Sequence, residues 1–323
     1  MKKTCIVLFT LLLLLFSVGC KGEKTEENLY FIMPYHYVQT PNGWNTIPYE
    51  VYRYTGGDTY SLMYAFPDSG EYAACLSGAY LYYVPEAGGS ITRVDLSNNT
   101  EQPFAGLPDG RISTLVAEGD KVFAIWNSQT QHVLYQVTIE NAQVICSDVM
   151  MQAELALGDG GLYYVDFQEG TLIRYDLSGG ENQIIADRVG SGKLEFDGGF
   201  VYSCGTSCYR YNVETGEKAF VHRGSGSRVK DDWLYYPDSL FCEGDSYVEV
   251  LRRNMKNGTI ESCGSAFIPY LGAQTFRKTI DFGAKGFVVY LTERTRGTEY
   301  MYFPYGASQG KLLHSTDVIQ QGE

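Results

Sequence analysis

A short phrase of residues recurs along the chain and constrains the fold more than any other feature. An aromatic-rich stretch at 81–84 is followed by a stretch at 91–96 that has Arg at its centre and a polar turn at its end. The same order returns at 162–165 and 172–177. The phrase begins at seven positions, which are Leu29, Leu81, Val122, Leu162, Phe200, Leu234 and Phe287. Strand-forming self-similarity with a period of about 40 residues is typical of a β-propeller.

A second recurring position, usually Arg, also occurs seven times. The Arg position of the second stretch is occupied in turn by Arg53, Arg93, Gln136, Arg174, Arg210, Arg252 and Tyr302. Within one repeat, four short runs rich in Tyr, Val, Ile and Leu are bounded by Asp, Ser and Gly; they are 152–158, 161–166, 171–177 and 182–186. This is the pattern of strands joined by tight turns. No apolar period of a helix is sustained after residue 20. We therefore expect an all-β fold, a single seven-bladed β-propeller of four-stranded antiparallel blades over residues 29–323.

The two ends of the chain bear on how such a ring would close. The first repeat begins at its second strand, because residues 21–28 are charged and have no strand pattern. We expect the missing innermost strand to come from the last residues, around Val318 and Ile319, because pairing both ends removes an exposed sheet edge. The alternative is a frayed tail.

The repeat resembles known propeller families. An aromatic pair followed by Ile-x-Arg-x-Asp-Leu-x-Gly resembles the blades of low-density-lipoprotein-receptor-like (YWTD-like) propellers, and also those of a bacterial lipoprotein family of unknown function. The best matches are 162–180 and 80–96, whereas Gln136 and Tyr302 depart from the pattern. The resemblance implies a fold and no established catalytic residues.

The first 20 residues have the features of an export signal. Lys2 and Lys3 precede an apolar stretch at 5–16, and residues with small or medium-sized side chains occupy 17–19, before Cys20. The apolar stretch is short for a membrane-spanning helix. Cys20 after Gly19 resembles a bacterial lipobox, which predicts a lipoprotein signal peptide over 1–20 and lipid attachment, such as palmitate, at Cys20. Residues 21–28 then form a flexible tether. We expect a protein anchored by lipid at the extracytoplasmic face of the cell membrane; ordinary signal cleavage with release is the alternative.

The net charge and the spacing of the histidines bear on which partners and metals to expect. The formal net charge is −13 at pH 7, so nucleic acid is an improbable partner, since binding its phosphates needs a basic face. The histidines, His36, His132, His222 and His314, fall in different repeats without the spacing of metal ligands. We expect no metal and no cofactor.

The cysteines give one candidate disulfide. Of eight cysteines, Cys5 lies in the signal and Cys20 at the lipid site. Cys204 and Cys208 flank a tight turn between two expected strands, which would place their side chains opposite each other. A free buried Cys at each position is the alternative.

Basic residues recur in the loops that lead into each innermost strand of the expected blades. They are Arg111, Arg188, Lys193, Arg223, Arg228, Arg277 and Lys278. The opposite ends of these strands are acidic, with Glu118, Asp120, Asp159, Asp197, Asp231, Asp232 and Asp281. We infer a ring polarised along its axis, whose basic end binds an anionic ligand by focusing opposite charge. The alternative is that exposed loops simply carry charges.

Three long loops would reach the same end of the ring. They are 34–48 with Trp44, 239–246, and 265–274 with Tyr270. Long loops on a rigid scaffold are where recognition usually resides, and exposed aromatic rings suit sugar or peptide stacking. The alternative is that these rings pack onto the blades.

The sequence therefore predicts a membrane-anchored propeller that acts as a non-catalytic binding or scaffold module for an anionic wall polymer, a glycan or an envelope protein. The expected contacts are Trp44, Tyr270 and the basic residues. The alternative is a polysaccharide lyase or hydrolase with a Tyr or His base at the channel mouth, and a third possibility is a structural subunit of an envelope assembly. The Gly-x-Ser-x-Gly pattern at 306–310 belongs to a turn with no following helix, so it does not predict a serine hydrolase.

Overall fold

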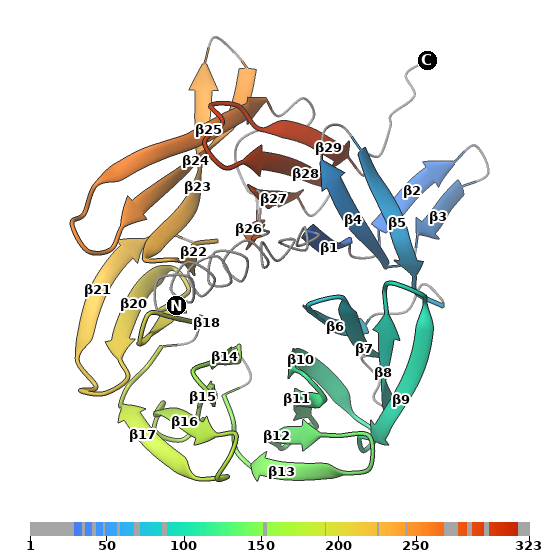
Figure 1. The fold of residues 1–323 in the computed structure, drawn as a ribbon, viewed down its shortest axis with the longest axis vertical. Helices are drawn as coiled ribbons and strands as arrows, with labels where there is room; N and C mark the ends of the chain where they lie inside the picture. The colour runs from blue at the N-terminus through green and yellow to red at the C-terminus, as the bar shows by residue number, and fades with distance from the viewer. Residues whose placement is uncertain are drawn as a thin grey trace, which may run out of the picture.

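The structure of the chain is a computed structural model. It describes residues 29–33, 36–40, 43–47, 49–56, 59–67, 72–85, 89–150, 154–190, 192–224, 226–242, 245–267, 277–282, 286–293 and 297–315. These residues form β-strands and turns, and the sheets are arranged around a central axis with their innermost strands facing it (Figure 1). The prediction of an all-β propeller is confirmed.

Six of the sheets have four antiparallel strands, ordered in space as in the chain. The first three are β6 (Tyr72–Ser77), β7 (Tyr80–Pro85), β8 (Ser90–Asp95) and β9 (Thr100–Gly106); β10 (Arg111–Glu118), β11 (Lys121–Asn127), β12 (His132–Val137) and β13 (Ala142–Cys146); and β14 (Ala156–Gly158), β15 (Gly161–Val165), β16 (Leu172–Asp176) and β17 (Asn182–Ala186). The others are β18 (Lys193–Asp197), β19 (Phe200–Cys204), β20 (Ser207–Asn212) and β21 (Lys218–Arg223); β22 (Arg228–Lys230), β23 (Trp233–Cys242), β24 (Asp245–Asn254) and β25 (Ile260–Phe267); and β26 (Arg277–Phe282), β27 (Gly286–Glu293), β28 (Gly297–Pro304) and β29 (Lys311–Ser315).

The prediction of seven four-stranded blades is wrong, because the described part of the chain forms a propeller with six. The residues assigned to the first blade instead form a three-stranded sheet of β1 (Leu29–Met33), β4 (Glu50–Gly56) and β5 (Thr59–Ala65). The inserted loop forms a separate two-stranded sheet, β2 (His36–Thr40) and β3 (Gly43–Ile47), which projects away from the ring (Figure 1). The phrase does occur seven times, but only six of its copies lie in four-stranded blades. The first copy lacks an innermost strand, because no strand is described before β1. Val318 and Ile319, expected to supply that strand, lie outside the described residues.

The three-stranded sheet packs between the last blade and the β6–β9 blade. Phe31 and Tyr52 belong to a cluster with Val288 and Tyr302 of the last blade. Val51 belongs to a second cluster, with Leu81, Tyr83, Val94 and Leu96 of the β6–β9 blade. Burial of apolar surface on both faces stabilises the sheet in this position although it has no fourth strand.

The recurring aromatic residues belong to buried clusters that join neighbouring blades. The first Tyr of each pair reaches the next blade. Tyr163 stacks on Phe196 of β18 with ring centroids 5.3 Å apart, and Tyr235 meets Phe282 of β26 edge-on at 4.8 Å. The Tyr82 hydroxyl donates a hydrogen bond of 2.6 Å to the Gly119 carbonyl in the next blade. A large apolar ring with a polar tip is well suited to such a cluster, because the ring packs on the next blade while the hydroxyl can reach a partner.

The recurring Arg of the third strand covers a second aromatic residue, which lies near the start of the second strand of the same blade. Arg93 lies over the Tyr80 ring, with its Cζ atom 5.0 Å from the centroid, and forms an ion pair with Asp120 of the next blade. Arg210 lies over Phe200 at 4.9 Å and Arg252 over Trp233 at 4.2 Å. A planar guanidinium can stack on a ring and bond a carboxylate at once. The Arg marker in the sequence is therefore a structural element of the blade.

Candidate binding site at the central channel

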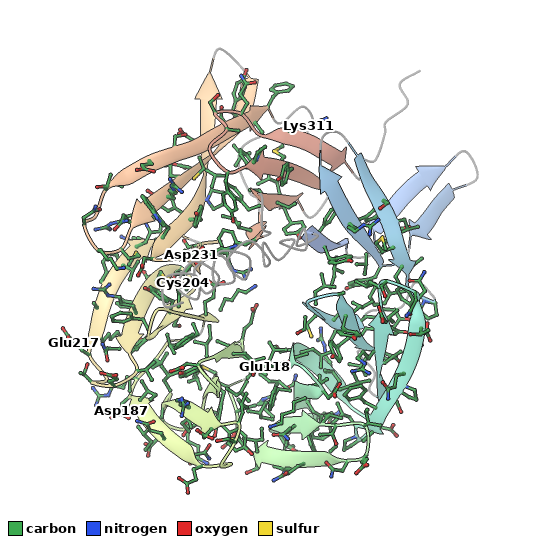
Figure 2. The ribbon with its side chains drawn as sticks, in the orientation of Figure 1. Glu118, Asp187, Cys204, Glu217, Asp231 and Lys311 are labelled. Carbon is green, nitrogen blue, oxygen red and sulfur yellow. A yellow bond between two sulfur atoms is a disulfide. The ribbon has the colours of Figure 1, made fainter. Side chains whose placement is uncertain are left out.

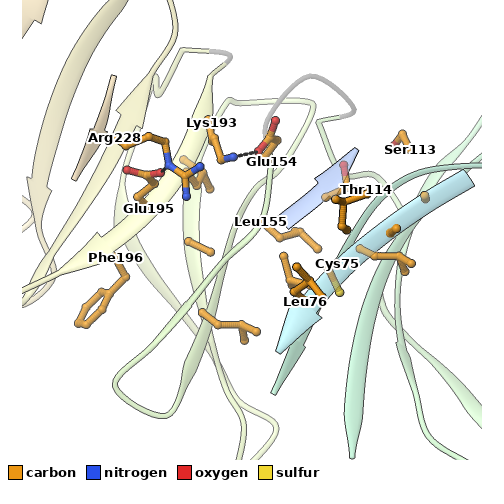
Figure 3. Close-up of a pocket in the computed structure, with 18 of the residues that line it drawn as sticks. Cys75, Leu76, Ser113, Thr114, Glu154, Leu155, Lys193, Glu195, Phe196 and Arg228 are labelled. Carbon is orange, nitrogen blue, oxygen red and sulfur yellow. Dashed lines mark ion pairs between the residues drawn. The ribbon is translucent and has the colours of Figure 1, made fainter. Parts of the chain in front are cut away.

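A cavity of about 740 Å³ lies at the centre of the ring, between the innermost strands. Its lining comes from β1, β6, β10, β14, β18, β22 and β26. The polar and charged side chains of this lining include Ser113, Thr114, Glu154, Lys193, Glu195 and Arg228 (Figure 3). The channel is therefore a place in the described structure where charged groups from separate blades meet.

Glu195 and Arg228 are the most buried charged pair of this lining. Glu195, only 8% exposed, points from β18 toward β22, where its Oε1 atom forms an ion pair with Arg228 Nε. The backbone N–H of Val229 donates a hydrogen bond of 2.5 Å to Glu195 Oε2. Arg228 Nη1 donates one of 2.8 Å to the Ile280 carbonyl on β26. One carboxylate and one guanidinium thus connect the innermost strands of three consecutive blades.

Lys193 and Glu154 form a second, more exposed pair in the same wall. Lys193 Nζ lies 3.5 Å from Glu154 Oε2, and the two side chains are 33% and 50% exposed. Lys193 opens β18, and Glu154 lies in the connection that leads into β14. An exposed ion pair contributes about 0–1 kcal/mol to stability. Lys193 can therefore exchange Glu154 for another anionic group at small cost.

The β18–β21 blade places four residues in one row across its four strands. Lys193 is opposite Cys204, Cys204 is opposite Cys208, and Cys208 is opposite His222. Cys204 and Cys208, the candidate pair from the sequence, are joined by a disulfide with their Cα atoms 4.0 Å apart. His222 stacks on Tyr236 at 4.3 Å, and burial lowers the pKa of its imidazole, with Arg253 adding to the effect. The row runs from the channel to the outermost strand.

The structure brings together some of the sequence-predicted basic residues and separates others. Lys193 and Arg228 line the channel, and Arg223 ends β21 opposite Ser207 of the same blade. Arg111 opens β10, in a different part of the ring. Arg188 follows the outermost strand β17, and its neighbour Asp187 lies at the rim (Figure 2), so Arg188 is remote from the channel.

Four other predicted site residues fall outside the part of the chain whose side chains the structure describes. Trp44 lies in β3 and Arg277 opens β26, but only their strands are described. Cys20 and Tyr270 lie outside the described residues altogether.

The acidic end of the blades is explained by turn geometry and pairing. Asp159, Asp231 and Asp232 have φ angles of 49°, 52° and 64°, which Asp tolerates in tight turns. The Asp197 carboxylate accepts hydrogen bonds from the backbone N–H groups of Asp231 and Asp232, at 3.2 and 2.8 Å. These acids hold turns together, so they do not by themselves define a binding site.

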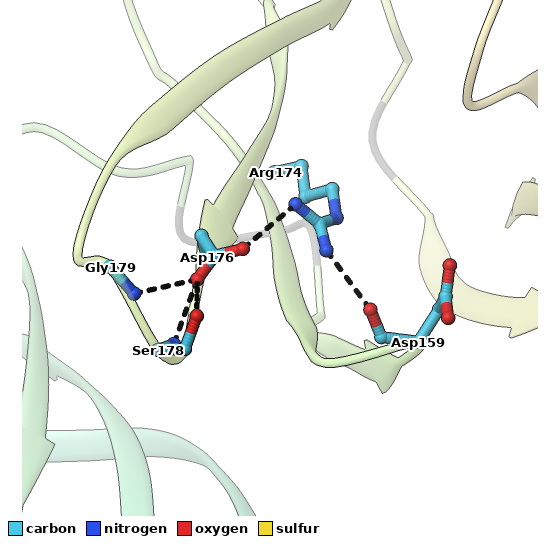
Figure 4. A network of polar contacts seen from close by, with 5 residues as sticks. All are labelled: Asp159, Arg174, Asp176, Ser178 and Gly179. Carbon is cyan, nitrogen blue, oxygen red and sulfur yellow. Dashed lines mark hydrogen bonds and ion pairs between the residues drawn. The ribbon is translucent and has the colours of Figure 1, made fainter.

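A network in the β14–β17 blade shows the same local use of charge (Figure 4). Arg174 donates a hydrogen bond of 3.0 Å to the Asp159 carbonyl and lies 3.4 Å from Asp176 Oδ2. The Asp176 carboxylate accepts bonds from Ser178 and from the Gly179 N–H, and these bonds hold its pKa below its ordinary value. Asp95, Asn212 and Asn254 cap the corresponding turns in other blades. The Asp of the repeated phrase is therefore a turn residue.

Sequence reasoning missed the two acidic members of the channel wall, Glu154 and Glu195. The available signal was weak: Glu195 is a lone acid between the apolar residues Leu194 and Phe196 of a short strand. Its partners, Arg228 and Val229, come from the next repeat, and a single repeat gives no sign of the contact.

The described residues also bear on two other kinds of site, a metal centre and a histidine near the channel. No group of three or more His, Cys, Asp or Glu side chains could hold a metal ion there. His132 lies in the third strand of its blade and His222 in the outermost strand, away from the channel lining. Within the same ranges, no helix is long and apolar enough to cross a membrane.

Fold and channel together define the chain as a β-propeller protein. Comparison with solved structures agrees. A catalytically inactive variant of virginiamycin B lyase from Staphylococcus aureus, in a structure with quinupristin, aligns with a TM-score of 0.52 and 11% identity over 83% of this chain and 93% of that one. At this identity the similarity concerns the fold alone.

Two further similar structures were found. The computationally designed protein Ika8 aligns with a TM-score of 0.48 and 12% identity, covering 75% of this chain and 85% of its own. A chain of a nidogen/laminin complex gives 0.44 and 11%, covering 72% and 93%. The chain matches no protein-family model and no curated protein sequence.

Proposed function

We propose that this protein is a non-catalytic binding module, anchored by lipid at Cys20 on the extracytoplasmic face of the membrane, whose propeller binds an anionic polymer or glycan at the basic end of the channel. The observation that carries the proposal is the position of Lys193 and Arg228. They open the adjacent innermost strands β18 and β22, and both line the 740 Å³ cavity.

The two cations would act differently on an anionic ligand. Arg228 is held in place by Glu195 and by the Ile280 carbonyl, so it presents a preorganised positive group whose local charge is partly balanced. One ion-pair partner of Lys193 is the half-exposed carboxylate of Glu154. A ligand carboxylate can take the place of Glu154 on Lys193, and several such contacts along a polyanion would add up.

The alternative of a lyase or hydrolase has less support. The virginiamycin B lyase structure shows a propeller of similar fold with a small molecule, quinupristin. In this chain, however, the described histidines lie away from the channel lining. The tyrosines of the channel wall, Tyr30 and Tyr72, belong to two different sheets, and no strand of either sheet contains a histidine. We therefore propose binding rather than catalysis.

Binding is tested with polygalacturonate, an anionic polyuronate, and with dextran, a neutral polysaccharide, on the full chain in detergent micelles. We expect polygalacturonate to bind and dextran not to bind, and the affinity to fall with added salt because charge attraction is screened. Lys193→Glu should weaken binding by about tenfold or more, a typical scale for a lost charge contact. Lys256→Glu is the matched control, since Lys256 pairs with Asp232 at the opposite end of the inner strands.

Equal binding of the two polysaccharides, or full binding by the Lys193→Glu variant, would refute the anionic site. A lack of binding together with co-purification of one envelope protein would favour the scaffold role instead. The anchor is tested separately: metabolic labelling with palmitate should mark the wild-type protein and leave Cys20→Ala unlabelled.

A further inference from the structure

The turn between β19 and β20 contacts the two chain segments that carry the channel cations. On one side, Ser203 Oγ donates a hydrogen bond of 3.2 Å to the Gly190 carbonyl. On the other side, the Gly224 N–H donates one of 3.0 Å to the Thr206 carbonyl. Residues 190–192 lead directly into Lys193, and residues 224–227 lead directly into Arg228. The turn therefore bridges the two inter-blade connections at the basic end of the channel.

The turn packs tightly against the connection that precedes Lys193, residues 190–192. A Cβ atom at Gly192 would lie 2.9 Å from the backbone nitrogen of Gly205 and 3.0 Å from the carbonyl carbon of Cys204. The backbones of the turn and of the connection are thus in direct contact. A movement of Cys204 must displace Gly192, and with it the neighbouring Lys193, since packed backbone cannot be compressed.

The disulfide closes this turn at its base. Cys204 and Cys208 are directly opposed across β19 and β20, and their Cα atoms are 4.0 Å apart. The bond ties the last residue of β19 to the second residue of β20 and limits how far the two strand ends can move apart. Reduction removes this tie and leaves the turn free to shift against both connections.

We propose that the Cys204–Cys208 disulfide is a redox-sensitive latch that sets the anion affinity of the channel. The affinity part rests on the proposed function, whereas the conformational part does not. In the oxidised form the turn holds the connections before Lys193 and Arg228 in register. In the reduced form both connections gain freedom, and the positions of the two cations in the channel wall become less well defined.

The chemistry requires a dithiol reductant. A thiolate of the dithiol attacks the sulfur of Cys204, which is 8% exposed whereas Cys208 is 0% exposed, and Cys208 leaves as a thiolate. The second thiol of the reductant then attacks its own sulfur in the mixed disulfide and releases Cys204. Two electrons and two protons pass to the protein, which gains two thiols, and the reductant becomes a cyclic disulfide. Thr206, at the tip of the turn and two residues from Cys204, is exposed.

The first test measures polygalacturonate affinity of the full chain before and after dithiothreitol, a dithiol. We expect reduction to weaken binding by about tenfold, within the usual range of coupling between two sites. The double variant Cys204→Ser/Cys208→Ser should bind weakly and should not respond to dithiothreitol. It also controls for the described free cysteines Cys75, Cys146 and Cys263. A response of the double variant equal to that of the wild type would overturn the latch.

The second test is independent of any ligand. Amide hydrogen exchange of the segments 190–194 and 224–229 should become faster on reduction, while exchange in the β10–β13 blade stays unchanged. If polygalacturonate binds neither form but exchange responds, the anionic site is wrong and the conformational latch stands. If exchange and affinity are the same in both redox forms, the latch is wrong whatever the fate of the binding proposal.

Discussion

The carboxylate of Glu195 lies between the innermost strands of two blades and pairs there with Arg228 while accepting a hydrogen bond from the Val229 N–H. The Glu195 side chain thus pairs with both the guanidinium of Arg228 and the backbone N–H of Val229 at the inner edge of the next sheet. Innermost edges of open sheets carry unpaired backbone groups, and these would otherwise rely on water in the channel. The pair is therefore a structural support of the wall that carries the proposed site.

Removing the Glu195 carboxylate should destabilise the propeller. Breaking a fully buried ion pair by removing one partner costs about 3–5 kcal/mol. The cost here should lie at or below the lower end, because Arg228 keeps its bond to the Ile280 carbonyl and is 19% exposed. We expect Glu195→Ala to lower the free energy of unfolding in urea by roughly that amount. Glu195→Gln should cost less, since its amide oxygen can still accept from Val229.

The exposed Glu214 provides the control for this change. Glu214→Ala should lie within about 0.5 kcal/mol of the wild type, as surface substitutions usually do. Identical unfolding midpoints for Glu195→Ala and Glu214→Ala would contradict the structural role of the pair.

The recurring Arg should contribute to stability through its ring and carboxylate contacts. Arg93 lies over Tyr80 and Phe104 and bonds Asp120 and Gln102. We expect Arg93→Ala to cost about 1–2 kcal/mol, from a cation–π contact and a charge-assisted bond. Arg93→Lys should recover only part of this, because Lys lacks the planar fork.

The chain offers a matched control for the Arg position. Gln136 occupies the equivalent place in the β10–β13 blade. Gln136→Ala should change the unfolding free energy by about 0.5 kcal/mol or less. The interpretation fails if chemical denaturation shows Arg93→Ala to be as mild as Gln136→Ala.

His222 should make the protein less stable in mild acid. Burial, and then Arg253, lower the pKa of His222 in the folded state. The unfolded chain therefore binds a proton first as pH falls below about 6.5, and this contribution favours unfolding progressively until the folded-state pKa is passed. We expect His222→Phe, which can keep the stack on Tyr236, to show a smaller loss of melting temperature between about pH 7.5 and pH 5.5 than the wild type. An unchanged loss would show that His222 does not contribute.

Most of the contacts in the candidate site could not be predicted from a sequence pattern. Arg228 and Lys193 were predicted as basic residues at one end of the ring, and both line the channel. Arg188 carries the same charge in a similar loop, yet it follows an outermost strand and lies far from the others. The order of the loops can be read from the sequence, but their distance from the axis cannot.

The sequence by itself determined the features that depend on neighbouring residues. Alternation and turn chemistry within each repeat specified antiparallel strands, and a separation of four residues made Cys204 and Cys208 a candidate pair, which the structure joins by a disulfide. Only the tertiary structure decided that the first repeat is a three-stranded sheet rather than a full blade, and that Glu195 meets Arg228. The reason is physical: hairpin contacts are fixed by local backbone geometry, whereas contacts between blades depend on how complete sheets pack around one axis.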